Sequence, residues 1–403
     1  MRQRQWGTIG LAAVCAVLLS ETTAVQTLTA NDLFNDQVLH EIRLSINSRD
    51  LAELRERFRE NIYFPADLTW RGQRVRNVAV RSRGGGSRNG RKLGLKIDFN
   101  RYTTGQRFLG MRSLVLDNMW QDKALMREFL AMAVYRRIGE AAPRESYARL
   151  YINNEYQGLY CIVEDVTEEF VTRTTGDTGG YLYEYHWLRD FYMDYPGDDL
   201  NLYKPMFEPR NHELESDSTL YGPIRDLFRE INGPDDAVWR QRVGDRIDLA
   251  EFMTHVGVQG FLANNDGILG NFGINNFYLY RFNNSTRHRL IPWDEDQAFQ
   301  FPDITILRQG SQDVVLFQRA FAQADLKEQF LRAAERCAES ALEDNWLVNE
   351  VERVVVLIDA SVREDRRKQF TDDDFDLEVG FLRGVAAQRP QLVLDEVAQL
   401  RLR

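Results

Sequence analysis

The feature that most constrains the fold is an alternation of apolar and polar residues between positions 68 and 100. Apolar side chains recur at nearly two-residue spacing up to Val80, and again from Leu93 to Phe99. This spacing is typical of strands with one buried face, and a glycine run between two such stretches predicts a loop. We therefore expect antiparallel strands around a glycine-rich loop at Gly84–Ser87.

The rest of the chain has strand patterns early and helical patterns late. Further strands are predicted over 38–46, 148–152 and 158–164. A single helix over 122–138 lies among them, with Asp122 as its N-cap. Strands followed by helices predict an α+β fold of two lobes.

We place the boundary between the two lobes near residue 165. Residues 31–165 form the strand-rich N-terminal lobe, and residues 166–403 form the mostly helical lobe. Residues 172–220 are rich in Asp, Gly, Pro and Tyr and show little periodicity. This composition predicts a long loop or insertion in the second lobe.

The N-terminus has the pattern of a signal peptide. Arg2 and Arg4 precede a short apolar run over 11–19, and small residues follow it. The run is too short to cross a membrane comfortably. We expect residues 1–30 to be removed and the protein to be secreted or otherwise extracytoplasmic, with membrane contact only through this segment. An uncleaved anchor is the alternative.

Composition excludes several classes of function. The 403 residues carry a formal net charge of −10, which argues against a nucleic-acid partner. The five histidines lack the helical pairing of zinc hydrolases. The Gly-x-Ser-x-Gly elbow of α/β-hydrolases and the Gly-x-Gly-x-x-Gly dinucleotide fingerprint are also missing from the sequence.

One constellation of polar residues has the spacing of a phosphoryl-transfer site. Asp266 and Asn271 are separated as the Asp and Asn of a kinase catalytic loop are, and Asp294 follows a predicted hairpin. Phosphoryl transfer needs a carboxylate that orients the attacking hydroxyl, and further oxygen ligands that hold Mg²⁺ against the phosphates. Any one of these residues alone is more often a turn or cap residue; together they predict a metal site.

The predicted glycine loop is basic. It consists of Arg83, Gly84, Gly85, Gly86 and Ser87, and Lys92 and Lys96 follow it. Glycines let backbone N–H groups approach phosphates, and lysines on the next strand can point at them. A basic hairpin with a flexible tip is the alternative.

Two glutamates complete the candidate set. Glu128 lies on the predicted helix, where a kinase-like fold places the partner of the phosphate lysine, although most such glutamates are surface residues. Glu164 ends a strand where the chain would cross between the lobes. It could lie beside an adenine or simply terminate an exposed strand.

Several strings make the chain similar to a known family. They are Arg83-Gly-Gly-Gly-Ser-Arg, Asn154-Glu-Tyr-Gln-Gly-Leu-Tyr and Ile291-Pro-Trp-Asp-Glu-Asp. With their neighbours they resemble the spore coat protein H (CotH) kinase family over roughly residues 38 to 400. The resemblance implies an atypical, bilobal protein-kinase-like fold with a nucleotide-binding N-terminal lobe. It also implies ATP, Mg²⁺ or Mn²⁺ as cofactors, and transfer to Ser residues of secreted or coat proteins.

The resemblance also assigns roles. Asp266 would be the catalytic Asp and Asp294 the metal ligand, with Asp296 as a possible second contact. Either Lys92 or Lys96 would bind phosphate. The metal-binding amide would be Asn271 by kinase spacing or Asn276 by family alignment.

Two other functions stay open at this point. Some family members are described as adhesins, so a kinase-shaped surface or coat protein without catalysis is the main alternative. Transfer to a sugar or small molecule is the weaker one, since a kinase-like pocket does not name its acceptor.

Overall fold

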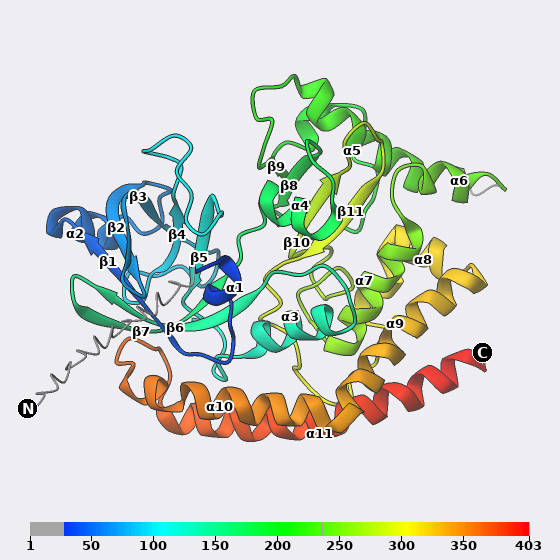
Figure 1. Cartoon of the computed structure of the whole chain (residues 1–403). Coiled ribbons are helices and arrows are strands. Elements are labelled where there is room, and N and C mark those ends of the chain that lie inside the picture. The colour runs from blue at the N-terminus through cyan, green and yellow to red at the C-terminus, as the bar shows by residue number, and fades with distance from the viewer. Residues whose placement is uncertain (1–27, 235–236, 403) are drawn as a thin grey trace, which may run out of the picture.

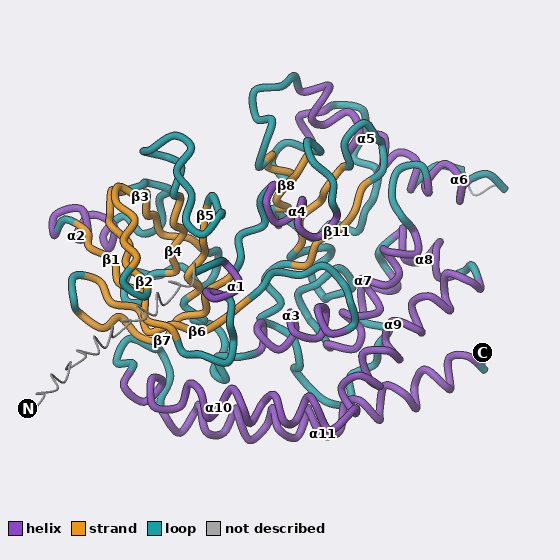
Figure 2. The backbone as a smooth tube through the Cα atoms, viewed as in Figure 1, coloured by secondary structure: helices purple, strands orange, loops and turns teal. Residues whose placement is uncertain are grey.

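The computed structural model describes residues 28–234 and 237–402. The predicted signal segment lies almost wholly outside the described residues. Within them, none of the helices is both long enough and apolar enough to span a bilayer. Strands gather in two groups and most helices lie beside and below them (Figure 2), as predicted for an α+β protein of two lobes.

The first lobe is a closed barrel in the order β1-β2-β3-β4-β5-β7-β6. β6 returns beside β1 in parallel, and the other neighbouring pairs are antiparallel. Alternate side chains such as Leu44, Leu68 and Leu95 fill its interior, as the two-residue spacing predicts. Its strands are β1 (His40–Ile46), β2 (Phe64–Trp70), β3 (Gln73–Arg83), β4 (Gly94–Asp98), β5 (Ser113–Asp117), β6 (Glu145–Ile152) and β7 (Glu155–Val163).

The second lobe contains a smaller sheet in the order β11-β10-β8-β9. The segment 172–220, predicted as a long loop or insertion, supplies two of these strands. Its alternating tyrosines explain this, because Tyr183 and Tyr185 are buried against the core of the second lobe. The strands are β8 (Tyr181–Tyr185), β9 (Phe207–Pro209), β10 (Phe277–Arg281) and β11 (His288–Pro292).

The helices cover the second sheet and continue beneath the barrel. α2 packs on the barrel, and α3 lies between the lobes (Figure 1). The α-helices are α1 (Ala30–Leu33), α2 (Ser48–Glu56), α3 (Arg127–Arg137), α4 (Glu168–Thr175), α5 (Asp217–Ile231), α6 (Trp239–Gly244), α7 (Leu249–Leu262), α8 (Val315–Phe321), α9 (Ala324–Leu342), α10 (Trp346–Glu364) and α11 (Asp372–Arg401). Short 3₁₀ turns are η1 (Leu200–Leu202), η2 (Gln309–Gln312) and η3 (Glu343–Asn345).

The helix predicted over 122–138 begins later than expected. Its N-cap is Met126, not Asp122. The Asp122 carboxylate instead accepts hydrogen bonds from the backbone N–H groups of Met126 at 2.7 Å and Arg127 at 2.8 Å. The Asp122 carboxylate, four residues before the N-cap, therefore accepts hydrogen bonds from N–H groups that lack partners within the helix.

α10 and α11 form a hairpin that runs under both lobes (Figure 1). At the barrel end, Arg149 donates to the Ser361 hydroxyl at 2.9 Å and Tyr156 donates to the Ser361 carbonyl at 3.0 Å. At the other end the buried Arg389 side chain donates to backbone carbonyls, including that of Phe261 at 2.9 Å. This hairpin therefore ties the last element of the chain to both lobes.

Candidate functional site

A polar cavity of about 630 Å³ lies where the barrel faces the second sheet. Its walls come from the glycine loop after β3, the end of β5, strands β8 and β9, the loop after α7, and the segment after β11. The side chains most relevant to chemistry are Arg83, Ser87, Asp117, Glu184, His186, Glu208, Asp266, Asn275, Asn276, Asp294 and Asp296.

Asp266 stands in the loop after α7 and is held by two amides. Asn275 Nδ2 donates to Asp266 Oδ1 at 3.0 Å, and Asn276 Nδ2 donates to Oδ2 at 3.1 Å. Burial raises the pKa of Asp266 and these two hydrogen bonds lower it. The carboxylate is thereby fixed in orientation while still lining the cavity.

The β10–β11 hairpin brings Asn276 and Asp294 together. Asn276 directly precedes β10, Asp294 lies just past β11, and Trp293 N–H donates to the Asn276 carbonyl at 3.2 Å. Both residues have positive φ, 59° for Asn276 and 53° for Asp294. Asn and Asp occupy this region more readily than bulky residues do, and such conformations gather at functional sites.

A buried carboxylate braces the two segments that carry the aspartates. Glu295 is fully buried and accepts hydrogen bonds from Gln259 at 2.9 Å, from Tyr135 at 3.3 Å and from Asn264. Burial raises the pKa of Glu295 to about 7. Because Asn264 precedes Asp266 and Glu295 follows Asp294, this contact fixes the two aspartates relative to each other.

Five carboxylates line a smaller hollow that adjoins the cavity: Asp117, Asp122, Glu128, Asp294 and Asp296. Burial and the Asp117 carboxylate raise the pKa of Asp294 to about 6, against the opposing effect of Arg83. Burial and Asp294 hold the pKa of Asp296 well above its usual range. Oxygen-rich, mutually repelling groups of this kind suit Mg²⁺ or Mn²⁺, and a divalent cation would relieve the repulsion.

Glu128 belongs to this acidic group and not to a lysine pair. Burial and the nearby Glu145 and Asp294 carboxylates raise its pKa well above the usual range. Among the described residues it has no ion-pair partner within 4.0 Å. The structure therefore places the predicted partner of the phosphate lysine beside the aspartates that would hold a metal.

The basic group nearest these carboxylates is Arg83. Its Nη1 lies 3.2 Å from Asp117 Oδ2, and its guanidinium lies 5.2 Å from the centre of the Trp293 ring. The Asp117 and Asp294 carboxylates hold its pKa above the usual value although burial lowers it. Arg83 ends β3 immediately before the glycine loop, so one side chain links that loop to the acidic wall.

Lys92 and Lys96 are both paired elsewhere. Lys92 Nζ lies 2.8 Å from Asp365 Oδ2 with both side chains essentially inaccessible, and Lys96 Nζ lies 2.7 Å from Asp165 Oδ2. Burial lowers the pKa of each lysine and the paired carboxylate opposes it. Neither lysine is among the described residues that line the cavity, so the structure does not choose between them as a phosphate ligand.

The glycine loop itself has a conformation that needs glycine at one position. Gly84 has φ +113°, and a Cβ atom there would lie 2.6 Å from Ser87 Oγ. Gly85 and Gly86 meet no such close contact. The loop therefore turns at Gly84 and carries Gly85, Gly86 and Ser87 along the cavity wall.

Two other predicted residues lie outside the cavity. Asn271 is exposed, and the cavity lining among the described residues includes Asn276 instead. Glu164 is buried between Arg144 at 2.7 Å and Arg173 at 2.6 Å. Sequence reasoning gave no role to Asp117 or Asn275, although Asn275 adjoins Asn276, one of the two predicted metal-binding amides.

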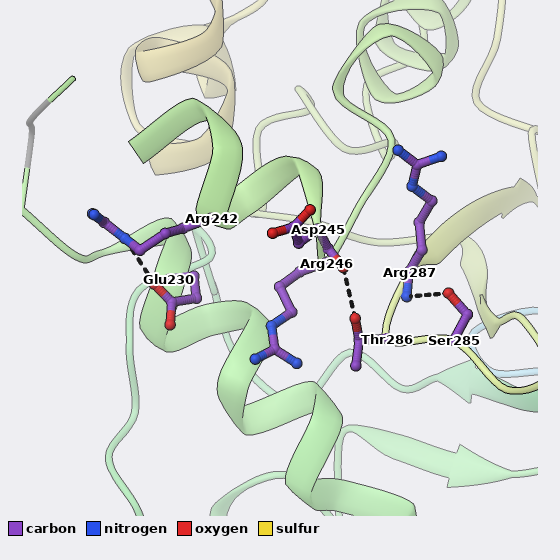
Figure 3. A pocket seen from close by; sticks show the side chains of 7 residues that line it. All are labelled: Glu230, Arg242, Asp245, Arg246, Ser285, Thr286 and Arg287. Carbon is purple, nitrogen blue, oxygen red and sulfur yellow. Dashed lines mark hydrogen bonds and ion pairs between the residues drawn. The ribbon is translucent and has the colours of Figure 1, made fainter. Parts of the chain in front are cut away.

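A second hollow, of about 580 Å³, lies in the other half of the second lobe between α6 and the β10–β11 turn. Figure 3 shows that basic and acidic side chains line it together, with Glu230 bonded to Arg242. Thr286 donates to the Asp245 carbonyl at 2.8 Å. This second hollow has neither the glycine loop nor the group of buried carboxylates. We therefore assign the candidate phosphoryl-transfer site to the cavity that contains Asp266 and Asp294.

A strand barrel joined to a helical lobe, with a glycine loop facing paired acidic segments across a cavity, defines a protein-kinase-like protein. The family model described as CotH kinase protein matches residues 80–393. The chain therefore belongs to the CotH kinase family, which confirms the resemblance seen in the sequence.

The chain is also similar to a curated coat protein and, at low TM-scores, to two solved structures. Inner spore coat protein H of Bacillus subtilis (strain 168) is 22% identical over 366 residues, which cover 89% of this chain and 97% of that protein. The Helicobacter pylori proinflammatory kinase CtkA superposes with a TM-score of 0.33 at 12% identity, over 77% of this chain and 94% of that one. A Golgi casein kinase with Mn/ADP bound gives 0.29 at 9% identity, over 90% and 75%. These two scores are too low to support an argument from superposition.

Proposed function

We propose that this protein is an extracytoplasmic kinase that uses ATP and Mg²⁺ or Mn²⁺ to phosphorylate Ser residues of coat or other secreted proteins. The observation that carries the proposal is the pairing of Asp266, fixed by two amides, with the Asp294 and Asp296 carboxylates in one cavity. The similarity to an inner spore coat protein supports the location and the class of acceptor.

The residues divide the work of phosphoryl transfer as follows. Asp266 orients the acceptor hydroxyl and accepts its proton, because its carboxylate faces the cavity while Asn275 and Asn276 hold it. Asp294, Asp296 and the Asn276 amide oxygen are the groups that would hold the cation, and Asp117 and Glu128 add negative charge beside them. A divalent cation held there would supply positive charge that offsets the charge of the phosphates.

Arg83 and the glycine loop supply the remaining phosphate contacts. A guanidinium presents several N–H donors in a fixed plane and binds phosphate oxygens through two of them at once. Arg83 now pairs with Asp117 at 3.2 Å, and it would exchange this carboxylate for phosphate oxygens when nucleotide binds. Arg83 therefore takes the part that a lysine has in most kinases.

The test is transfer of labelled phosphate from ATP to Ser-containing acceptors by the purified chain with Mg²⁺ or Mn²⁺. Wild-type protein should label acceptors, and Asp266→Asn should lose at least about 100-fold in rate while it still binds nucleotide, as expected for loss of a general base. Asp373→Asn, an exposed carboxylate on α11, is the matched control and should behave as wild type. Equal labelling by wild type and Asp266→Asn contradicts the assigned role.

One observation favours the alternative, a kinase-shaped coat or surface protein without catalysis. Lys92 and Lys96 are both engaged in buried ion pairs. A chain that binds Mn²⁺ and ATP but transfers nothing would fit this function. A chain in which Asp294→Asn abolishes both nucleotide binding and transfer would exclude it.

A further inference from the structure

A second group of metal-ligating side chains lies on the opposite wall of the cavity. Glu184 is in β8 and His186 follows it two positions later, so both project from the same side of an extended segment. Glu208 is the cross-strand partner of Glu184 in β9. The His186 N–H donates to the Met206 carbonyl at 2.8 Å, which continues the ladder past the end of the strand.

The three side chains converge closely. One ligand atom from each of Glu184, His186 and Glu208 lies within 4.8 Å of the other two. His186 Nε2 lies 2.8 Å from Glu208 Oε2, and the His186 and Glu208 side chains are 42% and 51% exposed. An ion can therefore reach them from the solvent-filled cavity without rearrangement of the core.

The side chains around Glu184, His186 and Glu208 have a net negative charge, which attracts a cation. Glu184 and Glu208 contribute two negative charges, and Arg210 contributes one positive charge at 3.5 Å and 3.4 Å from them. With neutral His186 these four side chains carry a net charge of −1, and Arg81 and Arg83 line the same cavity. Arg210 therefore weakens, but does not cancel, the attraction for a divalent ion.

We propose that Glu184, His186 and Glu208 bind a transition-metal ion, Zn²⁺ in preference to Mg²⁺. An imidazole with two carboxylates favours zinc and its neighbours, whereas Mg²⁺ prefers oxygen ligands alone. Three protein ligands leave a coordination position open to water or to an oxygen of the acceptor. The site goes beyond the proposed kinase function, since neither nucleotide nor phosphoryl transfer is needed to form it.

The ligands of this proposed zinc site differ from those around Asp294 on the opposite side of the cavity. The Asp294 wall offers carboxylate and amide oxygens from the hairpin, the loop after α7 and the end of β5. The Glu184 wall offers a ring nitrogen from the β8–β9 edge. One chain would thus hold a hard cation beside Asp294 and a softer one beside His186.

The test measures binding of Zn²⁺ alone, without nucleotide, to the full-length metal-free chain by equilibrium dialysis and isothermal calorimetry. His186→Ala and Glu208→Gln should each weaken one Zn²⁺ equivalent by more than about tenfold. Asp294→Asn should retain that equivalent, and Arg210→Gln should tighten it because one opposing charge is lost. In the Co²⁺-loaded protein, the visible absorption of the bound ion should disappear in His186→Ala.

A matched control comes from another histidine–glutamate pair. His212 Nδ1 lies 3.6 Å from Glu215 Oε1, and the His212 ring packs against the Tyr181 ring. Within the described part of the chain, no third carboxylate, histidine or cysteine converges on this pair closely enough to complete a metal site. His212→Ala should therefore leave Zn²⁺ binding unchanged.

Three results would overturn the proposal. The first is unchanged Zn²⁺ binding in both His186→Ala and Glu208→Gln. The second is loss of the same equivalent in Asp294→Asn, which would assign the ion to the other wall. The third is weaker binding of lysine-containing peptides by His186→Ala and Glu208→Gln, with Zn²⁺ binding unchanged. That result would mean that Glu184, His186 and Glu208 bind basic side chains instead of a metal. All of these binding measurements can be made, and interpreted in the same way, even if the protein does not transfer phosphate.

Discussion

Replacement of Asp294 by asparagine should stabilise the metal-free protein and at the same time abolish its response to metal. Burial and the Asp117 carboxylate raise the pKa of Asp294 from 3.8 to about 6. Each pKa unit corresponds to about 1.4 kcal/mol, so ionised Asp294 costs on the order of 3 kcal/mol at neutral pH. Asparagine removes the charge, keeps the shape and tolerates the positive φ of 53° at this position.

The assay is thermal unfolding of wild type and Asp294→Asn with and without Mn²⁺ and ATP. Without metal the variant should melt higher, by ~5 °C for a cost of this size. With Mn²⁺ and ATP the wild type should gain stability through binding, and the variant should gain little.

The pH dependence has a definite sign. The pKa of Asp294 is higher in the folded than in the unfolded protein, so the cost is absent at low pH, builds up between about pH 4 and pH 6, and is complete above that. The advantage of the variant should therefore be small near pH 4 and largest at neutral pH. A variant that melts below wild type at pH 7 without metal would refute the reasoning, because it would mean that the Asp294 charge is compensated within the protein.

Three further changes test other parts of the site. Lys92→Met should destabilise the fold by about 3–5 kcal/mol in thermal or chemical unfolding, since the buried Asp365 charge loses its ion-pair partner. Lys92→Met with Asp365→Asn should recover much of the loss, because asparagine removes the charge and keeps an oxygen that accepts from the backbone N–H groups of Arg367 and Lys368. Arg83→Gln should weaken ATP binding, measured by calorimetry, by about tenfold or more, as expected for one charge-assisted phosphate contact. Glu295→Gln should lower the transfer rate more than the affinity for ATP, because it loosens the brace between the two aspartate segments.

The outcomes that contradict these expectations are equally specific. Unchanged stability in Lys92→Met, together with a loss of ATP binding, would return Lys92 to the phosphate site. Unchanged ATP affinity in Arg83→Gln would remove the arginine from it. A wild-type rate of phosphate transfer in Glu295→Gln would mean that this carboxylate contributes to stability alone.

Local patterns in the sequence were sufficient for most strands of the barrel, although not for β5, and for the hairpin that carries Asp294. Two-residue alternation has one structural meaning when a face is buried, and a hairpin brings its flanking residues together whatever surrounds it. The site residues near β10 and β11 could therefore be recognised from the chain alone. Spacing along the chain did not identify the amide beside Asp266, because that amide belongs to Asn276 at the far end of the loop between α7 and β10 and not to Asn271.

The lysines show where this reasoning ends. Strand parity indicated a shared face for Lys92 and Lys96, yet it could not say what that face meets. The partner of Lys92 is Asp365, far away in the sequence and at the end of α10. The late strands within 172–220 were missed for a related reason, since β8 and β9 are short and owe their form to packing against β10 and the core.

The α10–α11 hairpin has a consequence for the proposed binding and release of nucleotide. Many kinases open and close by hinge motion of one lobe against the other. Here such a motion would have to pull Lys92 from Asp365 and Arg149 from Ser361, and exposure of that buried charge pair alone carries a large energetic penalty. We therefore expect the two lobes to keep their relative positions during each catalytic cycle. Exchange of nucleotide would then depend on movement of the Gly84–Ser87 loop.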